Sequence, residues 1–100
     1  MRLRRRAEYL ALQALGRKVH GTYVLLLYRP AETTRIGITV SGRVGNAVVR
    51  NRIKRWIKEH VRRHRAGLPS GELVIVAKTS AKTADHQAVS DDLARALRRL

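Results

Sequence analysis

The sequence contains no cysteine and no phenylalanine, and aromatic residues occupy only 4% of its 100 positions. Without cysteine the chain forms no disulfide and offers no thiolate to a metal, which agrees with a reducing compartment such as the cytoplasm. The small share of aromatic residues indicates a modest, mainly aliphatic core. A chain of this length is expected to form one compact domain.

Long apolar runs are also missing. The longest, Tyr23 to Tyr28, is far too short to span a bilayer and has the composition of a strand. The first six residues include four arginines, but Glu8 and Gln13 interrupt the segment that follows, so it lacks the apolar region of a secretory signal. We therefore expect no membrane partner and no targeting segment.

Acidic residues are scarce as well. The chain has 22 Lys and Arg against 7 Asp and Glu, which gives a formal net charge of +15. Such a charge repels itself and calls for a polyanionic partner. Since a membrane is not expected, nucleic acid is the favoured partner class.

Apolar spacing and turn residues divide the chain into helices and strands. The predicted order is a helix at 7–15, strands at 22–28 and 35–41, a helix at 46–64, a strand at 73–79 and a last helix capped by Thr83. The first two strands are expected to pair as a hairpin, and a further short strand is possible near Val19. This order predicts a two-layer α+β domain.

The predicted helix at 46–64 is amphipathic. Its apolar side chains fall within a sector of about 140°. They are Val49, Ile53, Trp56, Ile57 and Val61. Most of the opposite side is cationic, formed by Arg52, Lys54, Arg55, Lys58, Arg62 and Arg65. We interpret Trp56 as a core residue in preference to a base-stacking platform.

The charge of this segment is nearly all of one sign. From Arg43 to Arg65 there are nine Lys or Arg and one acid, Glu59. A solvated helix face normally mixes signs, because like charges four residues apart cost a few tenths of a kcal/mol. A face that lies against phosphates tolerates this repulsion, so the pattern predicts a nucleic-acid interface. RNA is favoured over DNA, since no helix-turn-helix or zinc finger precedes the helix.

Two stretches carry a family resemblance: RIGITVS at 35–41 and GRVGNAVVRNRIKRWIKE at 42–59. They resemble the protein subunit of bacterial ribonuclease P, and the likeness continues into LVIVAK at 73–78. The resemblance implies a single domain over residues 1–100 with the order α-β-β-β-α-β-α. It also implies a left-handed β-α-β crossover around the basic helix, which the general rule for such connections would not predict.

The resemblance implies a role as well. The family's protein assists a catalytic RNA in the endonucleolytic removal of the 5′ leader from precursor tRNA. It implies that hydrolysis depends on Mg²⁺ held by the RNA subunit, that the protein alone has no catalytic residue and binds no metal, and that the two subunits associate 1:1. The expected partners are ribonuclease P RNA and the 5′ leader of precursor tRNA, in the cytoplasm.

By the same resemblance, one set of residues is expected to bind the RNA subunit. They are Arg43, Asn46, Arg50, Asn51, Arg52, Lys54, Arg55, Lys58 and Arg62. For Asn46 a helix cap and a direct RNA contact remain open alternatives.

The leader is expected in a cleft between the first helix and the sheet. Tyr9 matches an aromatic position of the family and could stack on a base or lie in the core. Tyr28 and Arg35 are further candidates from strand geometry. Gln13 and Gly42 depart from the family pattern, so the leader contacts differ in number or place.

Two alternatives remain: a ribosomal or other RNA-scaffolding protein, and an autonomous endonuclease. The second needs clustered acidic ligands, but most acids are scattered, and Asp91 and Asp92 point about 100° apart on a helix. We interpret this pair as solubilising residues. His60 and His64 have a metal-binding spacing, but Arg62 and Arg63 beside them oppose a cation.

Overall fold

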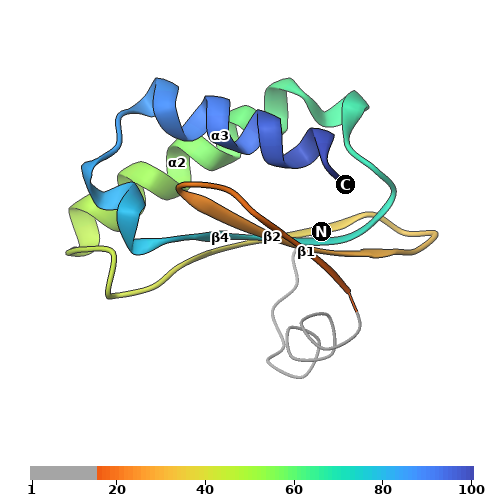
Figure 1. The fold of residues 1–100 in the computed structure, drawn as a ribbon, viewed down its shortest axis with the longest axis horizontal. Helices are drawn as coiled ribbons and strands as arrows, with labels where there is room; N and C mark the ends of the chain where they lie inside the picture. The colour runs from red at the N-terminus through yellow and green to blue at the C-terminus, as the bar shows by residue number, and fades with distance from the viewer. Residues whose placement is uncertain (1–15) are drawn as a thin grey trace.

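The computed structural model describes residues 16–100. The elements are β1 (Arg17–His20), β2 (Val24–Pro30), β3 (Arg35–Val40), α2 (Ala47–Arg63), β4 (Gly71–Ala77) and α3 (His86–Arg98), with short 3-10 turns at Arg65–Gly67 and Thr79–Thr83. The helix expected at 7–15, with Tyr9 and Gln13, lies outside the described residues. Figure 1 shows two layers, with α2 and α3 together on one face of the sheet. The predicted two-layer α+β architecture and the short strand near Val19 are confirmed.

The strands lie in the order β1-β2-β4-β3. β2 is antiparallel to both β1 and β4, whereas β3 is parallel to β4. The expected hairpin between the strands at 22–28 and 35–41 is therefore wrong, because β4 separates them. β2 and β4 carry apolar residues on both faces, as strands at the centre of a sheet do. The hairpin in the structure joins β1 to β2, and Gly21 N donates to Val24 O at 2.8 Å in its turn.

The parallel pair β3 and β4 is joined through α2, so the basic helix is the crossover of a β-α-β unit. Its apolar side meets the sheet in the main core. The largest fully buried side chains of this core are Val24, Leu26, Val44, Ile53, Ile57, Leu73, Ile75, Val89 and Leu93. Full burial of such a side chain stabilises the fold by about 1.5–3 kcal/mol. The core thus fixes which side of α2 faces outward.

α3 begins two residues later than expected. Its N-cap is Asp85, whose Oδ1 accepts from Ala88 N at 2.7 Å, so the assignment of the cap to Thr83 is wrong. Thr83 ends the preceding 3-10 turn and its hydroxyl donates to Ser80 O. The carboxylate of Asp85 binds the amide more strongly than a neutral hydroxyl would, which explains why it takes the cap position.

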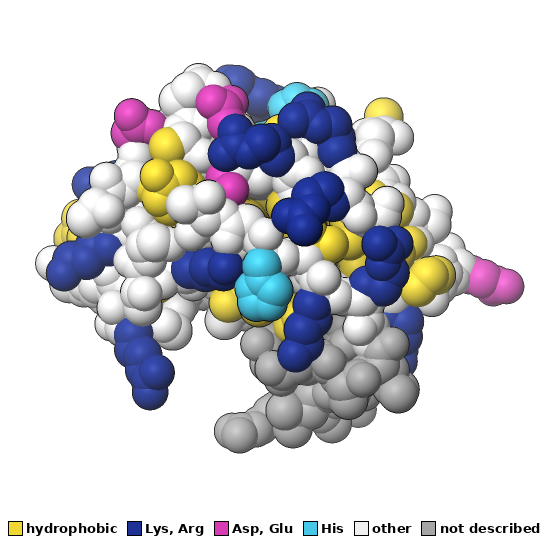
Figure 2. All heavy atoms as spheres, in the orientation of Figure 1, with side chains coloured by type: hydrophobic (Ala, Val, Ile, Leu, Met, Phe, Trp, Pro, Cys, Tyr) yellow, Lys and Arg dark blue, Asp and Glu magenta, His cyan; other side chains and the backbone are white. Residues whose placement is uncertain are grey.

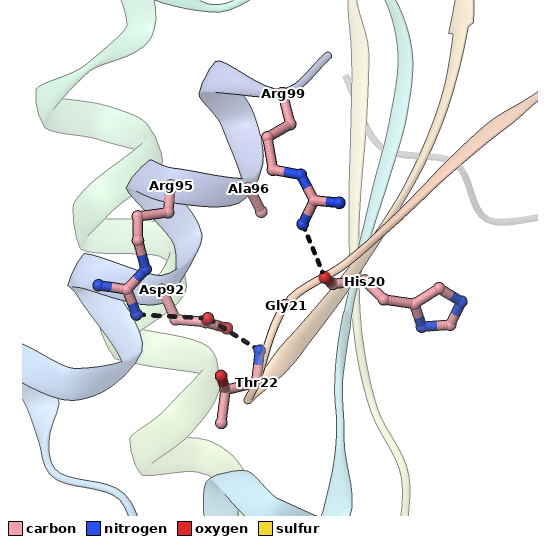
Figure 3. Close-up of a pocket in the computed structure, with 7 residues that line it drawn as sticks. All are labelled: His20, Gly21, Thr22, Asp92, Arg95, Ala96 and Arg99. Carbon is pink, nitrogen blue, oxygen red and sulfur yellow. Dashed lines mark hydrogen bonds and ion pairs between the residues drawn. The ribbon is translucent and has the colours of Figure 1, made fainter.

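Asp92 ties α3 to the sheet. This residue is only 2% exposed, so its interpretation as a solubilising residue is wrong. Its carboxylate accepts from the backbone N–H groups of three consecutive residues, at 2.9, 2.8 and 3.1 Å. These residues are Thr22, Tyr23 and Val24. Figure 3 shows Asp92 pointing from α3 toward the β1–β2 turn, beside a hollow of about 350 Å³.

The turn is shaped to receive this carboxylate. A Cβ at Gly21 would lie 2.5 Å from Asp92 Oδ2, so no larger residue fits there without a shift. The C-terminal end of α3 is fastened to β1 as well, since Arg99 Nη1 donates to His20 O at 3.1 Å (Figure 3). Both contacts hold α3 against β1 and the β1–β2 turn.

Candidate nucleic-acid interface

The apolar side of α2 lies as the sequence predicts. Ile53 and Ile57 are fully buried, and Val49, Trp56 and Val61 are partly buried against the same core. Because these residues face inward, the opposite side of α2 is presented to solvent. The orientation of the helix proposed from its periodicity is therefore confirmed.

The residues expected to bind RNA lie on α2 and in the turn before it. Those that are exposed are Arg43, Asn46, Asn51, Arg55, Lys58 and Arg62, and those that are half-buried are Arg50, Arg52 and Lys54. The fold thus places all nine residues on α2 or in the turn that precedes it. On the side of the molecule drawn in Figure 2, Lys and Arg side chains predominate over Asp and Glu.

Asn46 is the N-cap of α2. Its Oδ1 accepts from Val49 N at 3.0 Å, which satisfies one of the amides that the first turn leaves without a partner. The capping role is confirmed. An additional contact between Asn46 and RNA stays a prediction.

Charge balance differs along the helix. Glu59 Oε1 pairs with Arg62 at 2.7 Å and with Arg63 at 3.3 Å. The hydrogen bond and charge of Arg62 lower the pKa of Glu59, which therefore stays ionised. Within residues 16–100, no acid pairs with the cations of the earlier turns, which are Arg50, Arg52, Lys54, Arg55 and Lys58. The first three turns of α2 thus offer the least neutralised positive charge.

Two of these cations are held in place on the helix. Arg50 Nε and Arg52 Nε are buried and have no hydrogen-bond partner among the described residues. The Arg52 guanidinium carbon lies 5.3 Å from the Trp56 ring centroid, in a cation–π contact. The half-buried stem of Arg52 therefore limits where its charged end can point.

His60 joins α2 to α3, whereas His64 is exposed and contacts His60. His60 is 6% exposed, its Nδ1 lies 3.0 Å from Ser90 Oγ, and its ring stacks on His64 with centroids 4.3 Å apart. Burial lowers the pKa of His60, and the charge of His64 lowers it further. The i,i+4 spacing thus reflects the packing of α2 on α3 at His60, which residue spacing alone does not reveal.

The candidate leader residues do not come together. Tyr28 is 8% exposed within the main core, and its hydroxyl donates to Ser70 O at 2.6 Å. Arg35 is half-buried and pairs in register with Glu72, on the sheet face opposite to Tyr28. Tyr28 therefore has little surface for a ligand, and the leader contact expected of it is not supported. Tyr9 lies outside the described residues.

Comparison with known proteins finds relatives that match nearly the whole chain. The family model described as Ribonuclease P matches residues 1–100. The ribonuclease P protein component of Citrifermentans bemidjiense is 45% identical and covers 99% of this chain and 87% of its own length. That of Geotalea uraniireducens is 38% identical and covers 99% and 89%.

Solved structures agree with these relatives. The ribonuclease P protein of Staphylococcus aureus has a TM-score of 0.91 at 26% identity and covers 98% of this chain and 93% of its own. The protein from Thermotoga maritima has a TM-score of 0.87 at 29% identity and covers 100% and 97%. The likeness in sequence and the likeness in fold thus extend along the same residues.

Proposed function

Because the chain belongs to the ribonuclease P protein family, we propose that it binds ribonuclease P RNA through the outward side of α2 and the turn before it. The membership confirms the resemblance found at residues 35–59 and implies a part in tRNA 5′ maturation with the RNA subunit. The proposed contacts are Arg43, Asn46, Arg50, Asn51, Arg52, Lys54, Arg55, Lys58 and Arg62.

One observation carries this proposal: α2 is anchored by fully buried Ile53 and Ile57, while its first three turns carry cations without acidic partners within residues 16–100. Phosphates placed along this side would relieve the repulsion, and each neutralised phosphate would release counterions. The planar guanidinium of arginine can donate to two phosphate oxygens at once, and the ammonium of lysine is a compact charge. Together they suit an irregular RNA surface.

In this proposal the protein supplies binding and the RNA supplies the chemistry. Among residues 16–100, no three His, Asp or Glu side chains come together as ligands for a metal ion. Mg²⁺ would be held by the RNA subunit of a 1:1 complex. No helix in the same part of the chain is long and apolar enough to cross a membrane. The proposed site of action is the cytoplasm.

We place the leader of precursor tRNA on the sheet face that α2 and α3 leave uncovered. Arg35 lies on that face at the edge strand β3, and Gly37 and Thr39 follow it on the same side. Thr39 is exposed there, and the positive charge of Arg35 suits the phosphates of a single strand. Tyr9 stays a predicted stacking residue for the same leader.

A precursor-cleavage assay with a bacterial ribonuclease P RNA at low magnesium tests this function. Adding the protein is expected to restore cleavage and to tighten binding of precursor over mature tRNA. Removing the leader should abolish that preference. A scaffolding protein would ignore the leader, and an autonomous nuclease would cut without the RNA; either result would contradict the proposal.

A further inference from the structure

A ring stack lies at the junction of α2 and α3. Trp56, the one tryptophan of the chain, lies parallel to the ring of His86 with an interplanar angle of 7° and centroids 5.4 Å apart. Beside the pair is a hollow of about 200 Å³, lined by Arg55, Trp56, Glu59, Arg63 and His86. Trp56 packs against the main core, as expected, but it is only partly buried, so part of its ring is exposed.

The lining combines three kinds of chemistry within one hollow. His86 is exposed and Trp56 is only partly buried, so the rings leave aromatic surface beyond their own stack and the Arg52 contact, and Arg55 and Arg63 are exposed cations. Glu59 adds an acceptor: both of its ion pairs use Oε1, and Oε2 has no partner among the described residues. A bare phosphate would be repelled by this carboxylate and would leave the rings unused.

A nucleotide matches every part of the lining. Its base has a π-face for the rings and edge N–H groups for a carboxylate oxygen, and its phosphate is a partner for arginine. A base within a duplex has its faces stacked and its edge paired, so only an unpaired nucleotide can offer all three groups. Arg55 also belongs to the proposed RNA-binding side of α2, which places the hollow at the border of that surface.

We propose that the hollow between α2 and α3 receives one unpaired nucleotide of the RNA partner. Its base lies against Trp56 and His86, a base N–H donates to Glu59 Oε2, and its phosphate contacts Arg55 or Arg63. This inference rests on the proposed function, because it takes the bound RNA to lie along α2. It adds a stacking contact to an interface otherwise made of charge.

The first test compares Trp56→Leu with Trp56→Phe in the full chain, with affinity for a bacterial ribonuclease P RNA measured over a series of salt concentrations. Loss of base–aromatic stacking is expected to weaken binding about tenfold in the leucine variant, and phenylalanine should retain most of the affinity. The salt dependence should stay unchanged, because no phosphate contact is removed. Equal affinities for both variants and the wild type would overturn the proposal.

A second variant, at His86, tests the hollow without substituting Trp56, whose replacement could disturb folding. His86 is exposed at the first residue of α3, so His86→Ala should fold, and Gln87→Ala is its matched control on the neighbouring exposed position. His86→Ala should weaken RNA binding severalfold and Gln87→Ala should not. If the wild type binds this RNA and both alanine variants bind equally well, the hollow takes no nucleotide. If the wild type itself does not bind, the proposed function fails first.

Discussion

Asp92 places a charge in the interior, where only full hydrogen bonding makes it tolerable. Its carboxylate accepts three backbone N–H groups, and Arg95 approaches its Oδ1 at 3.6 Å. A buried carboxylate without such donors would cost several kcal/mol. These bonds therefore explain how a strand start and a helix can be joined through a charged side chain.

We expect Asp92→Asn to lower the free energy of unfolding by about 3 kcal/mol. The amide keeps the size of the side chain, but it loses the charge and turns an NH₂ group toward backbone donors. Urea unfolding of the variant measures this loss. Asp91→Asn, at the exposed neighbouring position, is the control and should change stability by less than about 0.5 kcal/mol. Equal stabilities would show that the three bonds contribute little.

His60 makes stability depend on pH. Because burial lowers its pKa from the usual 6.5, the unfolded chain takes up the proton first. The stabilising contribution of neutral His60 is complete above about pH 6.5 and declines as the pH falls toward the lowered pKa of the folded state. Between pH 7.5 and 5, the wild type should therefore lose more stability than His60→Gln. Thermal unfolding across this range tests the difference, and parallel curves would contradict it.

At the scale of the element, α2 combines an apolar anchor with a cationic outer side, and each can be changed separately. Arg52→Ala with Arg55→Ala leaves Ile53 and Ile57 in the core. We expect weaker assembly with ribonuclease P RNA and a salt dependence shallower by about one unit of log–log slope per lost phosphate contact. Lys82→Ala, at an exposed lysine outside α2, is the control. A folded double variant with an unchanged slope would count against the interface.

The cap of α2 gives a second prediction at this scale. Asn46→Ala should lower the free energy of unfolding by about 1 kcal/mol, because it leaves the N–H of Val49 without its acceptor. Asn46→Ser keeps a capping oxygen and should lose only a few tenths of a kcal/mol. Urea unfolding compares the two variants. Because the serine variant keeps the cap, any weakening of its RNA binding reports a direct contact of the Asn46 amide.

For the whole molecule, the sequence predicts the elements better than their arrangement. The 3.6-residue spacing of Ile53 and Ile57 fixes the inward side of α2, since periodicity acts within one element. The pairing of β2 with β4 joins residues more than forty positions apart, from Val24↔Ala77 to Pro30↔Gly71. Local turn chemistry carries no information on such a partner, so a hairpin between neighbouring strands was expected instead.

The candidate site was predictable to a similar degree. Its cationic side follows from residue types along one helix, whereas Trp56 meets His86 and His60 meets Ser90 only through the packing of α2 on α3. Tyr28 was expected at the leader site but lies in the main core. The alternation of side chains along a strand does not reveal which face of the sheet the helices cover. Contacts between elements were therefore the part that the sequence could not supply.

Because the chain passes from β3 to β4 through α2, the proposed binding of RNA to this helix would couple recognition to folding. β3 pairs with no strand other than β4 in the described sheet, and it reaches that partner only across the helix. Any polyanion that binds the ordered helix and not the unfolded chain shifts the folding equilibrium of the entire sheet by mass action. Bound RNA would then raise the free energy of unfolding of a chain whose net charge of +15 otherwise opposes a compact state.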